Sequence, residues 1–229
     1  MCELCKDTGW IHFEKNGMDY AKRCECQEIV ETEARLRKSG ISEEFLKKSF
    51  DNFDDMEKMP LHIAKSKAIQ YSENFPEIRH QRHNSILFMG QVGSGKTHLS
   101  MAICNKLLND YKIPVLYMPY RETILRIKQS VNDEINYNKA VERYKNTSVL
   151  MIDDLLKGKN TEADINILFE IINYRYLNNS PMIVSTERTL NQLLDFDEGV
   201  MSRLIEMAGG YTVEIKGQEY NYRLNGGRR

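Results

Sequence analysis

The feature that most constrains this chain is the glycine-rich stretch Gly90-Gln91-Val92-Gly93-Ser94-Gly95-Lys96-Thr97. It follows the G-x-x-x-x-G-K-T pattern of a phosphate-binding P-loop. An apolar run suited to a buried strand precedes it, and apolar residues at helical spacing follow it. Because backbone amides and a helix N-terminus converge on such a loop, the stretch predicts a site for nucleotide phosphates. A chance glycine-rich turn would lack this context.

The residues expected to contact the nucleotide are those of the loop and the one that follows it. They are Gly90, Gln91, Val92, Gly93, Ser94, Gly95, Lys96, Thr97 and His98. Lys96 can reach the β- and γ-phosphates of ATP, and the Thr97 hydroxyl can bind Mg²⁺. ATP and Mg²⁺ are therefore the expected ligands, and Lys96 is expected to take part in catalysis.

A second motif is the apolar run 149–154, which reads as a buried strand ending in two carboxylates. Asp153 is expected to hold Mg²⁺ together with Thr97, in part through water. Asp154 is expected to orient or deprotonate the water that attacks the γ-phosphate. The alternative is a strand followed by an acidic turn, which leaves the P-loop upstream without its usual partner.

The remaining chain alternates between strand-like and helix-like segments. Strands are expected at 85–89, 115–118, 149–154 and 181–187, and helices at 61–75, 121–145 and 161–177. The first of these helices is expected to end near Pro76. Such alternation predicts an α/β fold, a parallel sheet with helices on both faces, with phosphates bound at the carboxyl ends of the strands.

Four of the five cysteines fall within the first 26 residues. Cys2 and Cys5 form a C-x2-C pair, Cys24 and Cys26 form a C-x-C pair, and two strand-like runs lie between the pairs. Since the chain carries a P-loop and no signal peptide, these thiolates favour a tetrahedral Zn²⁺ site over disulfides. The alternative is four unrelated reduced cysteines, and His12 is expected at the surface.

The length of 229 residues suits one domain with an extension. We expect a zinc-binding module over 1–28, a helical linker over 29–60 and a P-loop ATPase domain over 61–229. Within the linker, the aromatic segment 49–53 is expected to be a packing anchor, although it could also flank the nucleotide base. A helix is expected over 27–39.

The net charge of −1 means that any contact with nucleic acid must come from a local basic patch. The apolar fraction of 41% is enough for a buried core. The sequence contains no apolar run of about 18 residues, which a membrane-spanning helix would need. A cytoplasmic protein without membrane contact is therefore expected.

From about residue 40 to its end, the chain resembles the AAA+ ATPases of the DnaC/DnaI helicase-loader group, to which the IstB-type transposition ATPases are related. The motifs that carry the resemblance are SGISEEFLKKSFDNF, GQVGSGKTHLSMAI, VLMIDDL, IVSTERTLNQLL, MSRLIEM and EYNYRL. The start, CELCKDTGWI…RCECQ, resembles the zinc module ahead of the ATPase in loaders of Gram-positive bacteria and their phages.

The resemblance implies roles for several catalytic residues. Arg203 matches the arginine finger, which reaches the γ-phosphate of a neighbouring subunit, and Arg223 matches the sensor-2 arginine, which contacts phosphate in its own subunit. The sensor-1 region, near the attacking water, contains Thr186 and Glu187, and either could act there. Many relatives carry Asn or Gln where Glu187 stands. Most members have Glu where Asp154 stands, so the shorter side chain implies slow turnover or a switch.

The resemblance implies an ATP-dependent loader that delivers a replicative DnaB-type helicase onto single-stranded DNA during the initiation of replication. It also implies self-association into a ring or spiral, with the stretch 121–145, Lys157 and Lys159 along the path of the DNA. The alternatives are an IstB-like ATPase that assists a transposase, a small-molecule P-loop kinase, and an interaction protein with an inactive nucleotide site. The cysteine module weighs against the IstB-like ATPase, and the lack of an arginine-rich lid segment weighs against the kinase. The intact nucleotide-binding motifs weigh against an inactive site.

Overall fold

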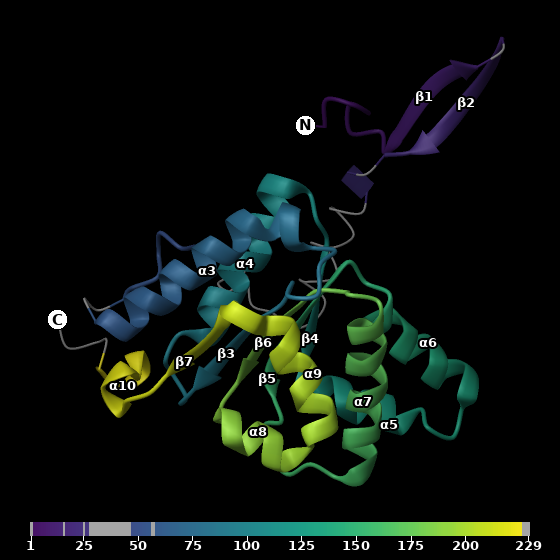
Figure 1. Cartoon of the computed structure of the whole chain (residues 1–229). Helices are drawn as coiled ribbons and strands as arrows, with labels where there is room; N and C mark the ends of the chain where they lie inside the picture. The colour runs from purple at the N-terminus through teal and green to yellow at the C-terminus, as the bar shows by residue number, and fades with distance from the viewer. Residues whose placement is uncertain (1, 16, 25, 28–46, 56–57, 226–229) are drawn as a thin grey trace.

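The computed structural model describes residues 2–15, 17–24, 26–27, 47–55 and 58–225. Its main body is a five-stranded sheet flanked by helices, and a separate two-stranded hairpin forms near the N-terminus (Figure 1). The helix expected over 27–39 lies outside the described residues from position 28 onward.

The sheet is entirely parallel, as the alternation of segments predicts. Its strands are β3 (Ile86–Gly90), β4 (Val115–Pro119), β5 (Val149–Leu155), β6 (Met182–Thr186) and β7 (Thr212–Ile215). Their order across the sheet is β4-β5-β6-β3-β7. The four expected strands are confirmed, whereas β7 is an addition. Its four residues, of which only Val213 and Ile215 are buried, are too few to give a clear pattern.

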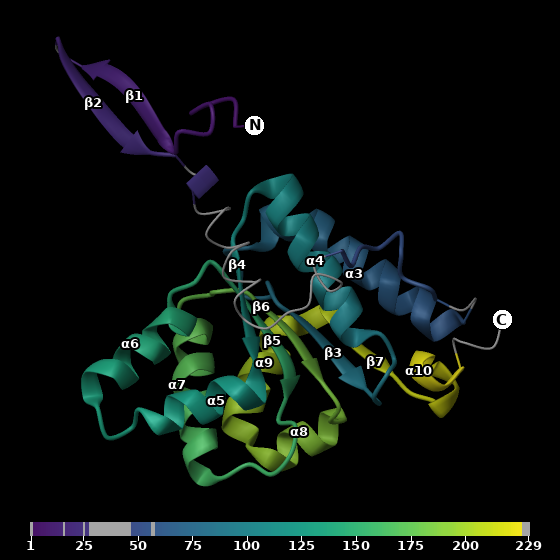
Figure 2. The ribbon, with the colours of Figure 1, turned by 180° about the vertical axis from the view of Figure 1, so that it is seen from behind.

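Helices cover both faces of this sheet (Figures 1 and 2). The larger ones are α3 (Met59–Ile78), α4 (Lys96–Tyr111), α5 (Tyr120–Gln129), α6 (Glu134–Lys145), α7 (Glu162–Leu177), α8 (Leu190–Phe196) and α9 (Glu198–Ala208). The chain then passes through a short 3-10 helix, β7 and a second 3-10 helix to α10 (Tyr222–Asn225). Among the described residues, no helix combines the length and the apolar character needed to cross a membrane.

The core is divided between the two faces of the sheet because successive strand residues point in opposite directions. On β3, Ile86 and Phe88 pack into a cluster with α3 and α4. Leu87 and Met89 pack into a second cluster with α5, α7, α8 and α9. Burial on both sides explains why the strands read as continuous apolar runs.

The first helix ends near Pro76, as expected, two residues beyond the proline. The helix α3 continues to Ile78 with the proline inside its last turn. A proline so close to the end removes a backbone donor from the helix, but the following turn still closes, since the Arg79 N–H donates to the Phe75 carbonyl at 2.9 Å.

The stretch 121–145, expected as one long helical segment, is two helices, α5 and α6. Ser130 ends the first, and its N–H donates to the Ile127 carbonyl at 3.0 Å. Asp133 then caps the second, because its carboxylate accepts a hydrogen bond of 3.1 Å from the Asn136 N–H. An Asp that satisfies the free amides of a first turn starts a new helix after the turn.

The N-terminal hairpin consists of β1 (Trp10–Lys15) and β2 (Met18–Arg23), paired antiparallel. These are the two strands expected between the cysteine pairs. Nearly every residue of the hairpin is exposed, so the hairpin itself has almost no hydrophobic core. Its stability must therefore depend on something other than apolar burial.

Candidate nucleotide-binding site

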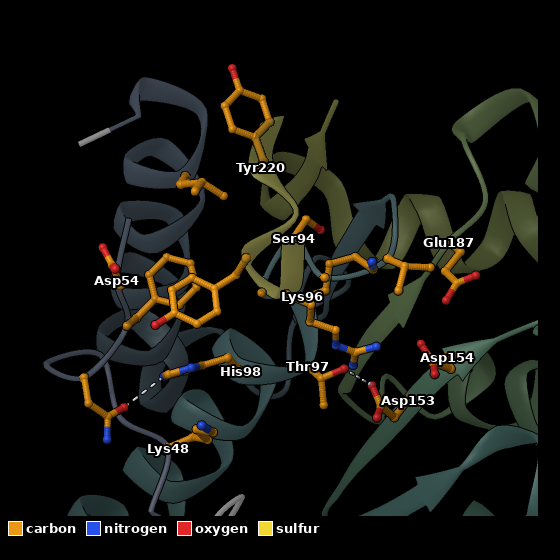
Figure 3. A pocket seen from close by; sticks show the side chains of 18 of the residues that line it. Lys48, Asp54, Ser94, Lys96, Thr97, His98, Asp153, Asp154, Glu187 and Tyr220 are labelled. Carbon is orange, nitrogen blue, oxygen red and sulfur yellow. Dashed lines mark hydrogen bonds between the residues drawn. The ribbon is translucent and has the colours of Figure 1, made fainter. Parts of the chain in front are cut away.

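A pocket lies where the P-loop meets the end of β5 (Figure 3). The expected nucleotide contacts that line it are Val92, Gly93, Ser94, Gly95, Lys96, Thr97 and His98. Gly90 and Gln91 are not among the lining residues. Gly90 ends β3, and the Gln91 side chain donates to the Gly217 carbonyl. In Figure 3 the carboxylates of Asp153, Asp154 and Glu187 lie on one side of Lys96, whereas His98 and Asp54 lie on the other. The pocket thus has an acidic end and an aromatic end.

Lys96 places a buried positive charge in the loop. Its side chain is 5% exposed, and its Nζ donates to the Gln91 carbonyl at 2.7 Å. Burial lowers the pKa of Lys96, while the nearby carboxylates of Asp154 and Glu187 oppose this shift. An ammonium held this way, with few partners, is suited to meet the oxygens of a phosphate.

Two glycines let other segments close tightly on the loop. Gly95 has a φ of +87°, and a Cβ there would lie 2.5 Å from Cε2 of Phe53. Gly93 has a φ of +76°, and a Cβ there would collide with the Asn221 side chain. The Tyr222 N–H also donates to the Gly93 carbonyl at 2.9 Å. Segments from before and after the ATPase sheet therefore meet at the P-loop.

The acidic end is organised around Asp153, which is 7% exposed. Its Oδ1 accepts hydrogen bonds from the Thr97 hydroxyl at 2.9 Å and the Ser185 hydroxyl at 2.5 Å, and its Oδ2 accepts from the Tyr117 hydroxyl at 3.1 Å. Burial raises the pKa of Asp153, and these donors oppose the rise. A hydroxyl and a carboxylate side by side are hard oxygen ligands, so Thr97 and Asp153 fit a Mg²⁺ ion.

A β-bulge re-aims the second carboxylate. The register of β5 against β6 shifts between Ile152 and Leu155, and Asp154 adopts a φ of +55°. Bulges next to sites commonly redirect a side chain in this way. The Asp154 N–H donates to the Ser185 hydroxyl at 2.9 Å, so one hydroxyl contacts both acidic residues.

Two residues of the site, Ser185 and Tyr117, have no role predicted from the sequence. A serine following the apolar residues of strand β6 is a signal that could have found the first, because a buried hydroxyl needs a partner. Nothing local marks Tyr117, which reaches Asp153 only because β4 and β5 are neighbours.

The two sensor-1 candidates lie in different places. Thr186 is fully buried, and its hydroxyl donates to the Leu155 carbonyl at 2.8 Å, outside the pocket lining. Glu187 lines the pocket, with its Oε1 3.3 Å from the Nζ of Lys157. Lys157 also lies 2.6 Å from the Oδ2 of Asp154. This lysine, which the resemblance places along a DNA path, therefore lines the nucleotide pocket.

The aromatic end contains part of the segment 49–53. The His98 Nε2 lies 2.9 Å from the Ser49 carbonyl oxygen and 2.9 Å from the Asn52 Oδ1. The Phe53 ring stands edge-on to the His98 ring, with centroids 5.1 Å apart. Phe53 also lines the pocket while packing against the core of α3 and α4. The segment is thus both an anchor and a wall on which a base can rest.

The two arginines to which the resemblance assigns roles, Arg203 and Arg223, lie in different places. Arg223 lines the pocket of its own chain. Arg203, on α9, is outside that lining, and its guanidinium donates to the Gly199 carbonyl. It also lies 5.7 Å from the ring of Phe169 and 5.6 Å from the ring of Tyr176. Arg203 is therefore positioned on the outer surface of the ATPase and not against its own P-loop.

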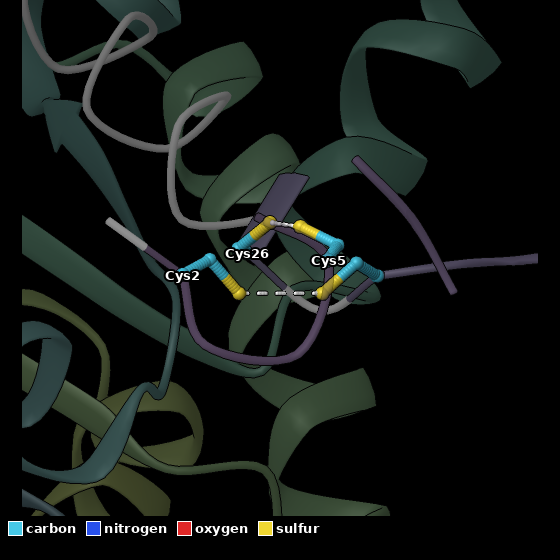
Figure 4. A group of neighbouring side chains, drawn as sticks. Cys2, Cys5 and Cys26 are labelled. Atoms are coloured by element: carbon cyan, nitrogen blue, oxygen red, sulfur yellow. Dashed lines mark hydrogen bonds between the residues drawn. The ribbon is translucent and has the colours of Figure 1, made fainter. Parts of the chain in front are cut away.

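The four N-terminal cysteines come together as a cluster (Figure 4). The sulfurs of Cys2 and Cys24 are 3.7 Å apart, those of Cys5 and Cys26 are 3.3 Å apart, and all four lie within 4.8 Å of one another. Zinc bound tetrahedrally at about 2.3 Å from each sulfur would separate the sulfurs by about 3.8 Å. The donor set and its spacing therefore fit a Zn²⁺ ion.

Comparison with known proteins gives a consistent family. Residues 44–212 match the family model described as the bacterial DnaA ATPase domain. The chain is 36% identical over 213 residues to the uncharacterized protein YqaM of Bacillus subtilis, covering 90% of this chain and 67% of that protein. It is 34% identical over 235 residues to the phage-like element PBSX protein XkdC of the same organism, covering 99% of this chain and 87% of that protein.

Among solved structures, the DnaC helicase loader superimposes with a TM-score of 0.67 at 21% identity, over 76% of this chain and all of that one. DnaI superimposes with a TM-score of 0.65 at 22% identity, over 77% of this chain and 95% of that one. At these identities the two structures establish the shared fold. Together with the P-loop and the acidic strand end, the matches show that the chain belongs to the bacterial DnaA ATPase-domain family and is an AAA+ ATPase.

Proposed function

We propose that this ATPase loads a replicative DnaB-type helicase onto single-stranded DNA. The observation that carries the proposal is the combination, on one chain, of a nucleotide pocket with a four-cysteine module ahead of it. The two structures described as the DnaC helicase loader and DnaI share the ATPase fold, which supports the same role. The family also includes chromosomal replication initiator proteins, so the reaction belongs to the start of replication.

Hydrolysis would proceed at the acidic end of the pocket. Lys96 would neutralise the β- and γ-phosphates, and Arg223 would contact phosphate from the C-terminal segment. Mg²⁺, held by Thr97 and Asp153, would supply further positive charge at the phosphate oxygens. Asp154 would accept a proton from the attacking water, whose oxygen bonds to the γ-phosphorus as the bond to the ADP oxygen breaks.

Arg203 would complete a neighbouring subunit's site. Its position on α9, outside the pocket of its own chain, is compatible with this role. A guanidinium presented from one subunit to the next neutralises the charge that develops in the transition state. Such a head-to-tail contact builds rings or open spirals, because the two surfaces in contact differ.

The cysteine module would provide the contact to the helicase. Its hairpin exposes large apolar side chains, including Trp10, Phe13, Met18 and Tyr20. The rings of Phe13 and Tyr20 stack with centroids 5.7 Å apart. Because exposed apolar groups that gather on one small module favour a protein contact, this hairpin is a suitable docking element. DNA would instead meet α5 and α6, through salt-dependent phosphate contacts.

Replacing Ser185 by alanine tests the hydrogen bonds of the acidic pair. Loss of the hydroxyl that joins Asp153 and the Asp154 amide should lower kcat for ATP about 10-fold to 100-fold, because the base loses its orientation. The KM for ATP should change much less. Steady-state ATPase assays at saturating Mg²⁺ measure both. Ser72→Ala removes another buried hydroxyl, on α3, and should have no such effect. An unchanged kcat in Ser185→Ala would remove the assigned role.

Metal analysis tests the zinc module. Protein purified under reducing conditions without chelator should contain about one Zn²⁺ per chain. Cys24→Ser should lose the metal and unfold the hairpin, which lacks a core, while ATP binding persists. Cys104→Ala alters the cysteine buried in the ATPase core and should leave the zinc content unchanged. Wild-type protein without zinc would contradict the module.

A loading assay tests the function itself. The DnaB-type helicase of the source organism should unwind a forked duplex on a single-stranded circle only when this protein and ATP are present. Lys96→Ala should abolish the stimulation because nucleotide binding fails. Cys24→Ser should abolish helicase binding while its ATPase activity persists. Stimulation of a transposase in place of the helicase would favour the IstB-like alternative and overturn the proposal.

A further inference from the structure

One cation of the pocket has no role in the mechanism above. The Nζ of Lys157 lies 2.6 Å from Oδ2 of Asp154 and 3.3 Å from Oε1 of Glu187. The side chains of the three residues are 44%, 33% and 31% exposed in that order, and all three line the nucleotide pocket. The residue proposed as the general base is therefore in an ion pair with a lysine of its own chain.

The backbone holds the start of this lysine in place. Asp154 and Leu156 both have left-handed φ values, +55° and +60°, and the Lys157 N–H donates to the Asp154 carbonyl at 3.0 Å. Leu155 and Leu156 are 1% exposed, so their side chains anchor the turn in the core. Non-glycine residues in this conformation persist where the surrounding structure requires it. The turn fixes the Cα of Lys157 and leaves its long side chain free to change partners.

Lys157 and Lys96 line the same pocket. Lys96, which faces the β- and γ-phosphates, has its pKa lowered by burial, and the positive charge of Lys157 lowers it further. The hydrogen bond to Asp154, and that to Glu187, raise the pKa of Lys157, so it stays charged. A charged ammonium thus lies beside the proposed base, in the same pocket as the phosphate-binding lysine.

We propose that Lys157 distinguishes ATP from ADP, by moving from Asp154 to the γ-phosphate when ATP is bound. This inference rests on the role proposed above for Asp154. With ADP, the ammonium stays paired with the Asp154 carboxylate and occupies the place of the attacking water. With ATP, the extra phosphate charge recruits the ammonium, while Glu187 continues to hold its other side. The carboxylate becomes available as a base only when there is a γ-phosphate to attack.

Electrostatics favours this exchange of partners. Three carboxylates, those of Asp153, Asp154 and Glu187, face the same end of the pocket. Without a compensating cation these carboxylates would repel the γ-phosphate. The repulsion would act on ATP alone, because ADP has no γ-phosphate. A partly exposed ion pair contributes little to folding stability, so removing Lys157 should leave the fold intact. Its effect should instead appear in the difference between the two nucleotides.

The test is a calorimetric titration of Lys157→Ala with Mg²⁺ and either ADP or the non-hydrolysable analogue AMPPCP. Affinity for the analogue should fall about tenfold, which is about 1.4 kcal/mol, while affinity for ADP changes less than twofold. Lys106→Ala removes a lysine paired with Asp110 at 3.3 Å on α4, outside the pocket, and should change neither affinity. Lys96→Ala should weaken the binding of both ligands, which would show that the titration measures binding at the P-loop.

Equal weakening of both nucleotides would overturn the inference, because Lys157 would then contribute only general positive charge. Unchanged affinities would overturn it as well, even if the ATPase rate rose, since the lysine would only restrain Asp154. These outcomes are independent of loading. A chain that discriminates between nucleotides through Lys157 but stimulates no helicase would contradict the proposed function alone.

Discussion

The hydrogen bond between the Thr97 hydroxyl and the Asp153 carboxylate joins the two halves of the site. The residues belong to α4 and β5, and the strand that precedes α4, β3, is separated from β5 by β6. This strand order explains the position of Ser185, which lies on the intervening strand and donates to the same carboxylate. The metal-binding pair, and with it the orientation of Asp154, therefore depends on three strands being in register.

The P-loop is also where distant parts of the chain converge. Phe53 presses on Gly95 from the segment that leads back toward the cysteine module, and Asn221 and Tyr222 contact Gly93 from the C-terminal side. Both segments also line the nucleotide pocket, through Phe53 and Tyr222. The fold thus offers a short physical route from the phosphates to the segment after the cysteine module. A loader needs such a route if nucleotide state is to control its hold on a partner.

The sequence predicted those features that depend on neighbours along the chain. The strand, loop and helix around Lys96 are contiguous, and apolar runs mark the parallel strands because both faces are buried. The strand order, and the contacts of Tyr117, Ser185 and Lys157, depend on residues brought together from separate strands and turns, so no local pattern shows them. The helix break before Asp133 was missed although Ser130, Asn132 and Asp133 are turn and cap residues that mark it locally. Arg203 and Arg223 came from the family resemblance, since lone arginines look like surface charge.

Mixing two inactive variants tests whether the ATP site is shared between subunits. Arg203→Ala keeps its own acidic pair, and Asp154→Asn keeps its arginine, so each should lose ATPase activity alone, the first by about 10³-fold. In a mixed assembly on DNA, an Arg203→Ala subunit beside an Asp154→Asn neighbour regains a complete site. If the site is shared, the mixture should hydrolyse ATP faster than either variant alone. A mixture that co-assembles with ATP and DNA yet stays as inactive as its parts would contradict a shared site.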